Sequence, residues 1–324
     1  MRAVRCHELT GPRSLRVDEV PSPSPGPSEV LIDVRAAGVN FPDVLMTYGK
    51  YQFKAAPPFS PGGEAAGVVR AVGAAVTSVA PGDRVCATMM MGAYAEQIVA
   101  SDATVTKLPD AVSFEVGAAT LLTYATTLHA LVDRAALQKD ETLLVLGAAG
   151  GVGTAAVELG KLLGARVIAA ASTDDKVAFC KERGAVEGIN YAREDLKERS
   201  KALTGGSGAN VIFDPVGGPY ADAALRSIAW EGRYLVVGFA AGDIPKIPLN
   251  LVLLKGCQIV GVFWGSFVMR DPAKNQANAR QILDWVAEGK LAPHVDSVLR
   301  FADAPSALER LERRDVKGKL VLVP

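Results

Sequence analysis

The sequence contains few of the residues from which metal sites and disulfide frameworks are built. Its 324 residues include only four cysteines and three histidines. Cys6, Cys86, Cys180 and Cys257 are far apart and form no C-x-x-C pair. This spacing argues against a disulfide framework and against a closed zinc site, because both need clustered cysteines. The cysteines are therefore expected to act as small apolar residues in a reducing compartment.

Net charge and long apolar runs are absent as well. Lysine plus arginine number 35 and aspartate plus glutamate number 35, so the formal net charge is zero. Neither nucleic acid nor an anionic membrane surface is favoured as a partner by this balance. No segment reaches the ~20 apolar residues of a membrane helix, and the N-terminus lacks the apolar core of a signal peptide. The sequence therefore predicts a cytoplasmic protein.

The first third of the chain has the pattern of short strands. Apolar runs at residues 30–34 and 68–72 are separated by turns rich in proline and glycine. Residues 81–85 predict a further turn that leads into another strand. Short strands joined by such turns are typical of a small β barrel.

From about residue 112 the pattern changes to longer helices that alternate with apolar strands. A helix is predicted over residues 116–136, and the alternation that follows predicts a doubly wound parallel sheet. The predicted strands are 142–146, 166–170, 211–213 and 234–237, and the first two helices of the alternation are 153–163 and 175–183.

The C-terminal segment leaves this alternation. Helices are predicted at residues 278–288 and 304–313, and a strand at 318–323. We expect the chain to return here to its first domain. Residues 1–122 with 267–324 would form a β-rich catalytic domain, and residues 123–266 an inserted α/β domain. The chain is long enough for two domains, and the cleft between them is the expected active site.

A glycine-rich loop at residues 147–153 stands between a predicted strand and a predicted helix. The missing side chains let a pyrophosphate approach the backbone, and the helix N-terminus offers free N–H groups and positive potential. The spacing is G-x-x-G-x-x-G rather than G-x-G-x-x-G, but its context predicts a dinucleotide site of the Rossmann type. The loop residues expected to contact the cofactor are Ala149, Gly150, Gly151 and Val152.

The end of the next strand indicates which dinucleotide binds. NAD sites usually place a carboxylate there to accept from the ribose hydroxyls, but residues 168–173 read Ile-Ala-Ala-Ala-Ser-Thr. The strand tip thus carries no negative charge that would repel a 2′-phosphate. The sequence therefore predicts NADPH rather than NADH. Asp174 and Asp175 are expected to cap the following helix. The residues expected to hold the phosphate are Ser172, Lys176 and Tyr191.

Five motifs in order resemble the medium-chain dehydrogenase/reductase superfamily. They are AAGVNFPD at 36–43, PGGEAAGVV at 61–69, the glycine loop, DPVGG at 214–218 and the terminal Gly318-Lys319. More narrowly, the set resembles the zinc-free, zeta-crystallin-like quinone oxidoreductase branch. The resemblance covers essentially the whole chain. It implies an α/β protein with a GroES-like β-rich catalytic domain and a Rossmann domain.

The residues at the family's zinc-ligand positions differ here. Zinc-dependent members have a cysteine where this chain has Asn40, and Gly-His-Glu where it has Gly62-Gly63-Glu64. Catalytic zinc needs three converging protein ligands, which cannot be assembled from the scattered histidines. The sequence therefore predicts no metal and no alcohol dehydrogenase activity, because a Lewis acid is missing. Glu64 is expected to make a structural hydrogen bond or salt bridge.

The resemblance also implies roles for other residues. Asn40 is expected beside the nicotinamide and the substrate, and Tyr51 near the substrate, so that one of them stabilises a developing oxyanion. Asp43 is expected to partner Asn40. The alternatives are a turn-capping Asn40, a surface Tyr51 and a solvent-facing Asp43. Further cofactor contacts are expected from Thr126, Gly238, Phe239, Phe263, Trp264 and either Lys317 or Lys319.

The predicted function is NADPH-dependent reduction of quinones by hydride transfer. Two alternatives stay open. One is reduction of enones or acryloyl-CoA-type substrates, and the other is a cofactor-binding structural or regulatory protein with little turnover. The resemblance also implies a homodimer formed through the nucleotide domain, for which residues 256–265 offer an apolar edge strand.

Overall fold

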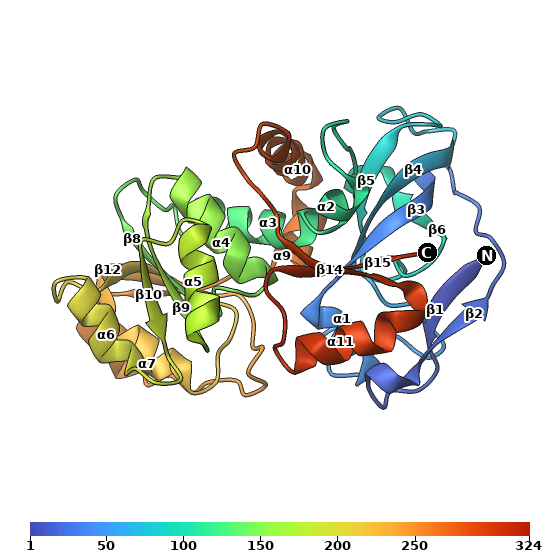
Figure 1. The fold of residues 1–324 in the computed structure, drawn as a ribbon. Coiled ribbons are helices and arrows are strands. Elements are labelled where there is room, and N and C mark those ends of the chain that lie inside the picture. The colour runs from blue at the N-terminus through green and yellow to red at the C-terminus, as the bar shows by residue number, and fades with distance from the viewer. The chain divides into compact units, whose positions relative to one another are not determined.

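The computed structural model describes all 324 residues and divides them into two compact units (Figure 1). Unit 1 comprises Met1–Ala125 and Phe267–Pro324, and unit 2 comprises Thr126–Ser266. Unit 1 is thus assembled from two segments that are far apart in the sequence. No helix in either unit combines the length and the apolar character that crossing a bilayer requires.

Unit 1 contains a seven-stranded sheet, a two-stranded sheet and four α-helices that lie wholly within it. The strands are β1 (Arg2–Cys6), β2 (Leu15–Glu19), β3 (Glu29–Val39), β4 (Glu64–Val72), β5 (Arg84–Thr88), β6 (Gln97–Ser101), β7 (Val105–Lys107), β14 (Val295–Arg300) and β15 (Lys319–Val323). The helices are α1 (Phe41–Thr47), α2 (Phe114–Ala118), α10 (Pro272–Ala287) and α11 (Ala304–Glu312). The large sheet has the order β14-β15-β3-β4-β5-β7, with β6 also paired to β3.

Strand β15 is the element that joins the two segments of unit 1. It pairs antiparallel with β3, placing Leu320 opposite Val39, and parallel with β14. The start of β15 therefore lies beside the end of β3 and the start of α1. The C-terminal segment therefore returns to the first domain through the pairing of β15 with β3.

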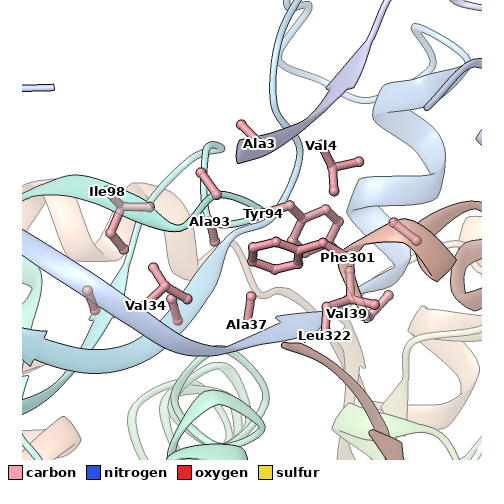
Figure 2. Packing of buried hydrophobic residues seen from close by; sticks show 14 of the residues in the cluster. Ala3, Val4, Val34, Ala37, Val39, Ala93, Tyr94, Ile98, Phe301 and Leu322 are labelled. Atoms are coloured by element: carbon pink, nitrogen blue, oxygen red, sulfur yellow. The ribbon is translucent and has the colours of Figure 1, made fainter. Parts of the chain in front are cut away.

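The core of unit 1 is formed by side chains from these joined strands (Figure 2). Tyr94 and Phe301 lie side by side with Val39 of β3 and Leu322 of β15. Tyr94 is fully buried. Burying one large apolar side chain contributes roughly 1.5–3 kcal/mol, so this cluster fixes β15 firmly against β3.

Unit 2 is a six-stranded, wholly parallel sheet in the order β10-β9-β8-β11-β12-β13. Its strands are β8 (Thr142–Leu146), β9 (Arg166–Ala171), β10 (Glu187–Asn190), β11 (Ala209–Asp214), β12 (Ile228–Val236) and β13 (Gln258–Gly261). Its helices are α4 (Gly151–Leu162), α5 (Asp174–Glu182), α6 (Leu196–Leu203), α7 (Tyr220–Arg226) and α8 (Leu249–Lys255). The predicted doubly wound sheet is confirmed. The chain runs from β8 outward to β9 on one side and later to β11 on the other, which makes the end of β8 a switch point where ligands bind in such folds.

The single helix predicted over residues 116–136 is wrong in detail. The chain forms α2, then a separate helix α3 (Leu121–Leu128), then a π-helical stretch at His129–Arg134. The break follows from Glu64, because its carboxylate accepts a hydrogen bond from the Leu122 N–H at 2.9 Å and so starts a new helix. A further helix, α9 (Trp264–Arg270), leads out of unit 2.

Candidate functional site

The glycine loop of unit 2 follows the central strand β8. Gly147 has φ +59°, a conformation that favours glycine, and it turns the chain sharply at the strand end. The Ala148 N–H donates to Ala170 O at 3.1 Å, which ties the loop to the end of the neighbouring strand β9. Gly150 then stands at the N-cap of α4, a helix of 12 residues. The loop therefore presents the free N–H groups of a helix N-terminus at the switch point of the sheet.

Glycine is present at the spaced positions of the loop for different physical reasons. A Cβ on Gly153 would lie 2.2 Å from Gly147 O and 2.7 Å from Ala148 Cα, so the loop and the helix can pack only with glycine there. A Cβ on Gly150 would meet nothing nearer than 3.4 Å. The fold therefore does not itself require glycine at 150, and a bare backbone at that position suits the approach of a pyrophosphate.

The tip of strand β9 carries no carboxylate, in agreement with the sequence. Ala171 is buried and pairs with Asn190 of β10, and its carbonyl accepts from the Tyr191 N–H at 3.1 Å. The Tyr191 ring packs on Tyr220 with centroids 4.3 Å apart. The Thr173 hydroxyl caps α5 by accepting from the Lys176 N–H at 3.2 Å. Tyr191 and the first turn of α5, which carries Lys176, thus lie at the same edge of the sheet, close to Ser172.

A buried carboxylate that sequence reasoning missed shapes the other side of the loop. Asp214, at the end of β11, accepts from the N–H groups of Val216 and Gly217 at 2.7 and 2.8 Å and from the Tyr234 hydroxyl. Burial raises the pKa of Asp214, against the effect of these hydrogen bonds. A Cβ on Gly147 would come within 2.7 Å of Val216, so the two loops are in contact. The DPVGG motif marks this loop, but nothing in it points to Tyr234.

The remaining predicted cofactor residues of unit 2 lie in three places. Gly238 and Phe239 follow β12, and the Gly238 N–H donates to Asp214 O at 3.3 Å, which places them against the Asp214 loop. Thr126 lies in α3, one residue before Thr127, whose hydroxyl donates to Val152 O in the glycine loop at 3.3 Å. Phe263 and Trp264 instead follow the edge strand β13, where the Phe263 side chain is largely exposed.

Unit 1 contains a buried polar cluster around Asn40, Glu64 and Lys319. The Lys319 ammonium donates to Glu64 Oε1 at 2.8 Å, to Val39 O at 2.9 Å and to Asn40 Oδ1. The Asn40 Nδ2 donates to Glu64 Oε1 at 3.0 Å. The three residues are buried, with Lys319 4%, Glu64 1% and Asn40 5% exposed. The predicted structural salt bridge of Glu64 is confirmed, and its partner is Lys319.

The hydrogen bonds of this cluster bear on two predicted roles, and both roles stay predictions. An ammonium has three N–H donors, and those of Lys319 face three acceptors inside unit 1, so none is left for a cofactor phosphate. The amide hydrogens of Asn40 are engaged by Glu64 Oε1 and by Gly38 O, at 3.0 and 3.3 Å. Asn40 is therefore a residue that positions its neighbours, and it holds no spare donor for an oxyanion.

Asp43 lies on the other side of Asn40. Its carboxylate accepts from the Asn40 N–H at 2.8 Å, from the Tyr94 hydroxyl at 2.7 Å and from the Gly62 N–H at 3.2 Å. The predicted partnership with Asn40 thus exists, and Tyr94, which no sequence motif singled out, completes it. Burial raises the pKa of the Asp43 carboxyl to about 6, against these hydrogen bonds and the Lys319 charge.

Tyr51 is the predicted site residue that keeps a free polar group. It packs partly buried against the core of unit 1, and its hydroxyl makes no hydrogen bond within the structure. Burial and the negative charge of Asp43 raise the pKa of this hydroxyl. A phenol held in its neutral form remains a hydrogen-bond donor at neutral pH.

The described residues contain no group of three or more His, Cys, Asp or Glu side chains arranged to hold a metal ion. A Cβ on Gly63 would lie 2.9 Å from the Leu122 side chain, so the position is crowded for any larger residue.

Comparisons with known proteins agree with this architecture. Residues 26–110 match the family model described as alcohol dehydrogenase GroES-like domain, and residues 151–288 match the one described as zinc-binding dehydrogenase. Quinone oxidoreductase-like protein 2 of Rattus norvegicus is 39% identical over 99% of this chain and 91% of its own length.

Two solved structures extend the likeness to the whole fold. The Escherichia coli quinone oxidoreductase complexed with NADPH has a TM-score of 0.94 at 29% identity, and 100% of both chains is covered. A mycobacterial protein complexed with NADPH has a TM-score of 0.94 at 33% identity, again with 100% of both chains covered. The chain belongs to the medium-chain dehydrogenase/reductase superfamily, in its quinone oxidoreductase-like branch.

Proposed function

We propose that this protein is an NADPH-dependent quinone reductase that works without zinc. The observation that carries the proposal is the Lys319 ammonium, which donates to both Glu64 and Asn40. Zinc, which the matched family's description implies, does not fit this cluster. The ammonium already supplies the positive charge that Glu64 needs, and a second cation beside it would be repelled.

Several residues of unit 2 would hold the cofactor. The N–H groups at the start of α4 would bind the pyrophosphate, and Ser172, Lys176 and Tyr191 lie at the strand edge where a 2′-phosphate would bind. Bound NADPH supplies the hydride, so the protein's task is to bind and orient. The NADPH complexes of the Escherichia coli and mycobacterial relatives support this choice of cofactor.

A second candidate is reduction of an activated C=C bond, and the free Tyr51 hydroxyl favours it. Hydride addition to an enone leaves an enolate that must gain a proton. A quinone delocalises the charge and needs less help. The raised pKa keeps the Tyr51 hydroxyl protonated and able to donate a hydrogen bond to such an enolate oxygen.

A panel of electron acceptors separates these possibilities. NADPH oxidation should be fast with 9,10-phenanthrenequinone and 1,4-benzoquinone, slow with cyclohexenone and acryloyl-CoA, and at least tenfold less efficient with NADH. Metal-free enzyme, prepared with a chelator and checked by elemental analysis, should keep full activity. Faster turnover of the alkenes would select the second candidate. Tight NADPH binding with no turnover of any acceptor would instead indicate a structural or regulatory protein.

We also propose that the protein is a homodimer formed through unit 2. Strand β13 is an edge strand of the sheet, and no other strand pairs with it on the side away from β12. Large apolar side chains are exposed nearby, with Leu253 at 79%, Trp230 at 69% and Ile259 at 40%. A monomer rarely leaves so many together.

Light scattering should therefore give about twice the chain mass of 33.9 kDa at micromolar concentration. Leu253→Asp in α8 should convert the protein to monomers. Val186→Asp, at an exposed position beside the opposite edge strand β10, is the matched control and should leave the dimer intact. A wild-type monomer would refute the proposal.

A further inference from the structure

The turn after strand β10 places an arginine that the 2′-phosphate residues named above do not include. Asn190, at the end of β10, is only 5% exposed. Its side-chain oxygen accepts from the Ala192 N–H at 3.2 Å, and its backbone carbonyl accepts from the Arg193 N–H at 3.0 Å. The turn is therefore fixed at its buried end, and Arg193 projects from a defined position.

The Arg193 guanidinium is held by Asp174, the first residue of α5. Its Nη2 donates to both oxygens of the Asp174 carboxylate. Asn190 Nδ2 donates to the same carboxylate at 2.8 Å. Asn190, Asp174 and Arg193 thus form a chain in which a buried amide orients a carboxylate and the carboxylate orients a guanidinium. Because only Nη2 is used, Nε and Nη1 of Arg193 remain available as donors.

The three linked side chains of Asn190, Asp174 and Arg193 lie at the strand end where the ribose of a dinucleotide binds in such folds. Asp174 lies three residues beyond Ala171, the last residue of β9, and the glycine loop is bonded to Ala170 of the same strand. In a dinucleotide fold the adenosine ribose lies at this strand end. A free carboxylate there would accept from the ribose hydroxyls and favour NADH. Asp174 is not free, because Arg193 and Asn190 neutralise and occupy it.

We propose that Arg193 is the residue that selects NADPH, with Asp174 as its positioning residue. The inference rests on the proposed use of NADPH and deepens it. The guanidinium presents one of the donors left free, Nη1 or Nε, to the 2′-phosphate, and Nη2 stays on Asp174. Because the guanidinium is charged, such a hydrogen bond to a phosphate is stronger than one from a neutral donor. The aspartate beside β9 therefore supports phosphate recognition in this chain, although a carboxylate in that region usually indicates NADH.

The test uses the full chain and two ligands that differ by one group, 2′,5′-ADP and 5′-ADP, with affinities measured by calorimetry. Arg193→Ala should weaken 2′,5′-ADP binding by about 10- to 100-fold and leave 5′-ADP binding unchanged. Arg193→Lys should recover part of the loss, because it keeps the positive charge but not the guanidinium that Asp174 orients. Asp174→Ala should weaken 2′,5′-ADP binding by a few fold, because it frees the guanidinium to move.

Folding is not at risk in these variants, because the Arg193 and Asp174 side chains are 67% and 63% exposed and such pairs contribute little to stability. Arg226→Ala, which breaks the exposed pair with Asp222 in α7, is the matched control and should change neither affinity. Equal losses for both ligands in Arg193→Ala, or no loss, would overturn the inference, as would tighter 2′,5′-ADP binding in Asp174→Ala. Failure of the wild type to reduce any quinone would count against the proposed function and leave this binding result standing.

Discussion

Replacing Lys319 with methionine is expected to lower the free energy of unfolding by about 3–5 kcal/mol, because it removes one partner of a buried ion pair. Glu64 is 1% exposed and would be left with only N–H donors, from Leu122 and Asn40, around its carboxylate. Denaturant unfolding of the variant and the wild type measures the difference. A loss below about 1 kcal/mol would mean that the pair contributes no more than a surface salt bridge.

A double variant separates the charge effect from simple loss of packing. Glu64→Gln combined with Lys319→Met removes both charges, and buried ion pairs replaced by neutral groups often lose little stability. The double variant should therefore be more stable than the sum of the two single effects predicts. Lys290→Met is the surface control, because Lys290 pairs with Glu288 where both side chains are about half exposed. Additive losses in the double variant would show that the ion pair is not the cause.

Gly153→Ala is expected to lower kcat/KM for NADPH by on the order of 100-fold, since a misplacement of about 1 Å can cost that much. The added Cβ would stand 2.2 Å from Gly147 O, and neither the loop backbone nor the first turn of α4 can yield without moving the N–H groups that would face the pyrophosphate. Steady-state kinetics at saturating quinone measure the effect. Wild-type kinetics together with an unchanged melting temperature would show that the loop accommodates the methyl group.

Gly150→Ala is the informative comparison within the same loop. Its Cβ would be 3.4 Å from the nearest atom, and the residue has φ −79°, which any amino acid adopts. The melting temperature should therefore stay unchanged. A lower NADPH affinity in this stable variant would locate the pyrophosphate at Gly150, whereas unchanged affinity would place the cofactor elsewhere on the loop.

The features of unit 2 that the sequence predicted well are local ones. The strand at residues 142–146 and the glycine loop follow from apolar runs and missing side chains, which are visible without knowledge of distant contacts. The parallel sheet follows from the alternation of such segments. The absence of a carboxylate at Ala171 is likewise local, because the residue type alone shows it.

The features that the sequence could not predict depend on long-range contacts. Lys319 and Glu64 are 255 positions apart, so no periodicity links them, and a C-terminal lysine was expected to face a phosphate. Tyr94 lies 51 positions from Asp43 and has the appearance of any core aromatic until the two are brought together. The interrupted helix after residue 114 has the same origin, because the group that starts α3 belongs to Glu64 on β4.

Strand β15 has a consequence for the order in which the nascent chain folds. Unit 2 is continuous in sequence, so its sheet can form on the ribosome once residue 266 has emerged. The large sheet of unit 1 lacks the strand between β14 and β3 until residues 319–323 emerge. Glu64 therefore has no Lys319 ammonium to pair with during most of translation. A chain truncated before residue 319 would combine an open sheet edge with an uncompensated buried carboxylate, and cellular proteases would remove it as unfinished.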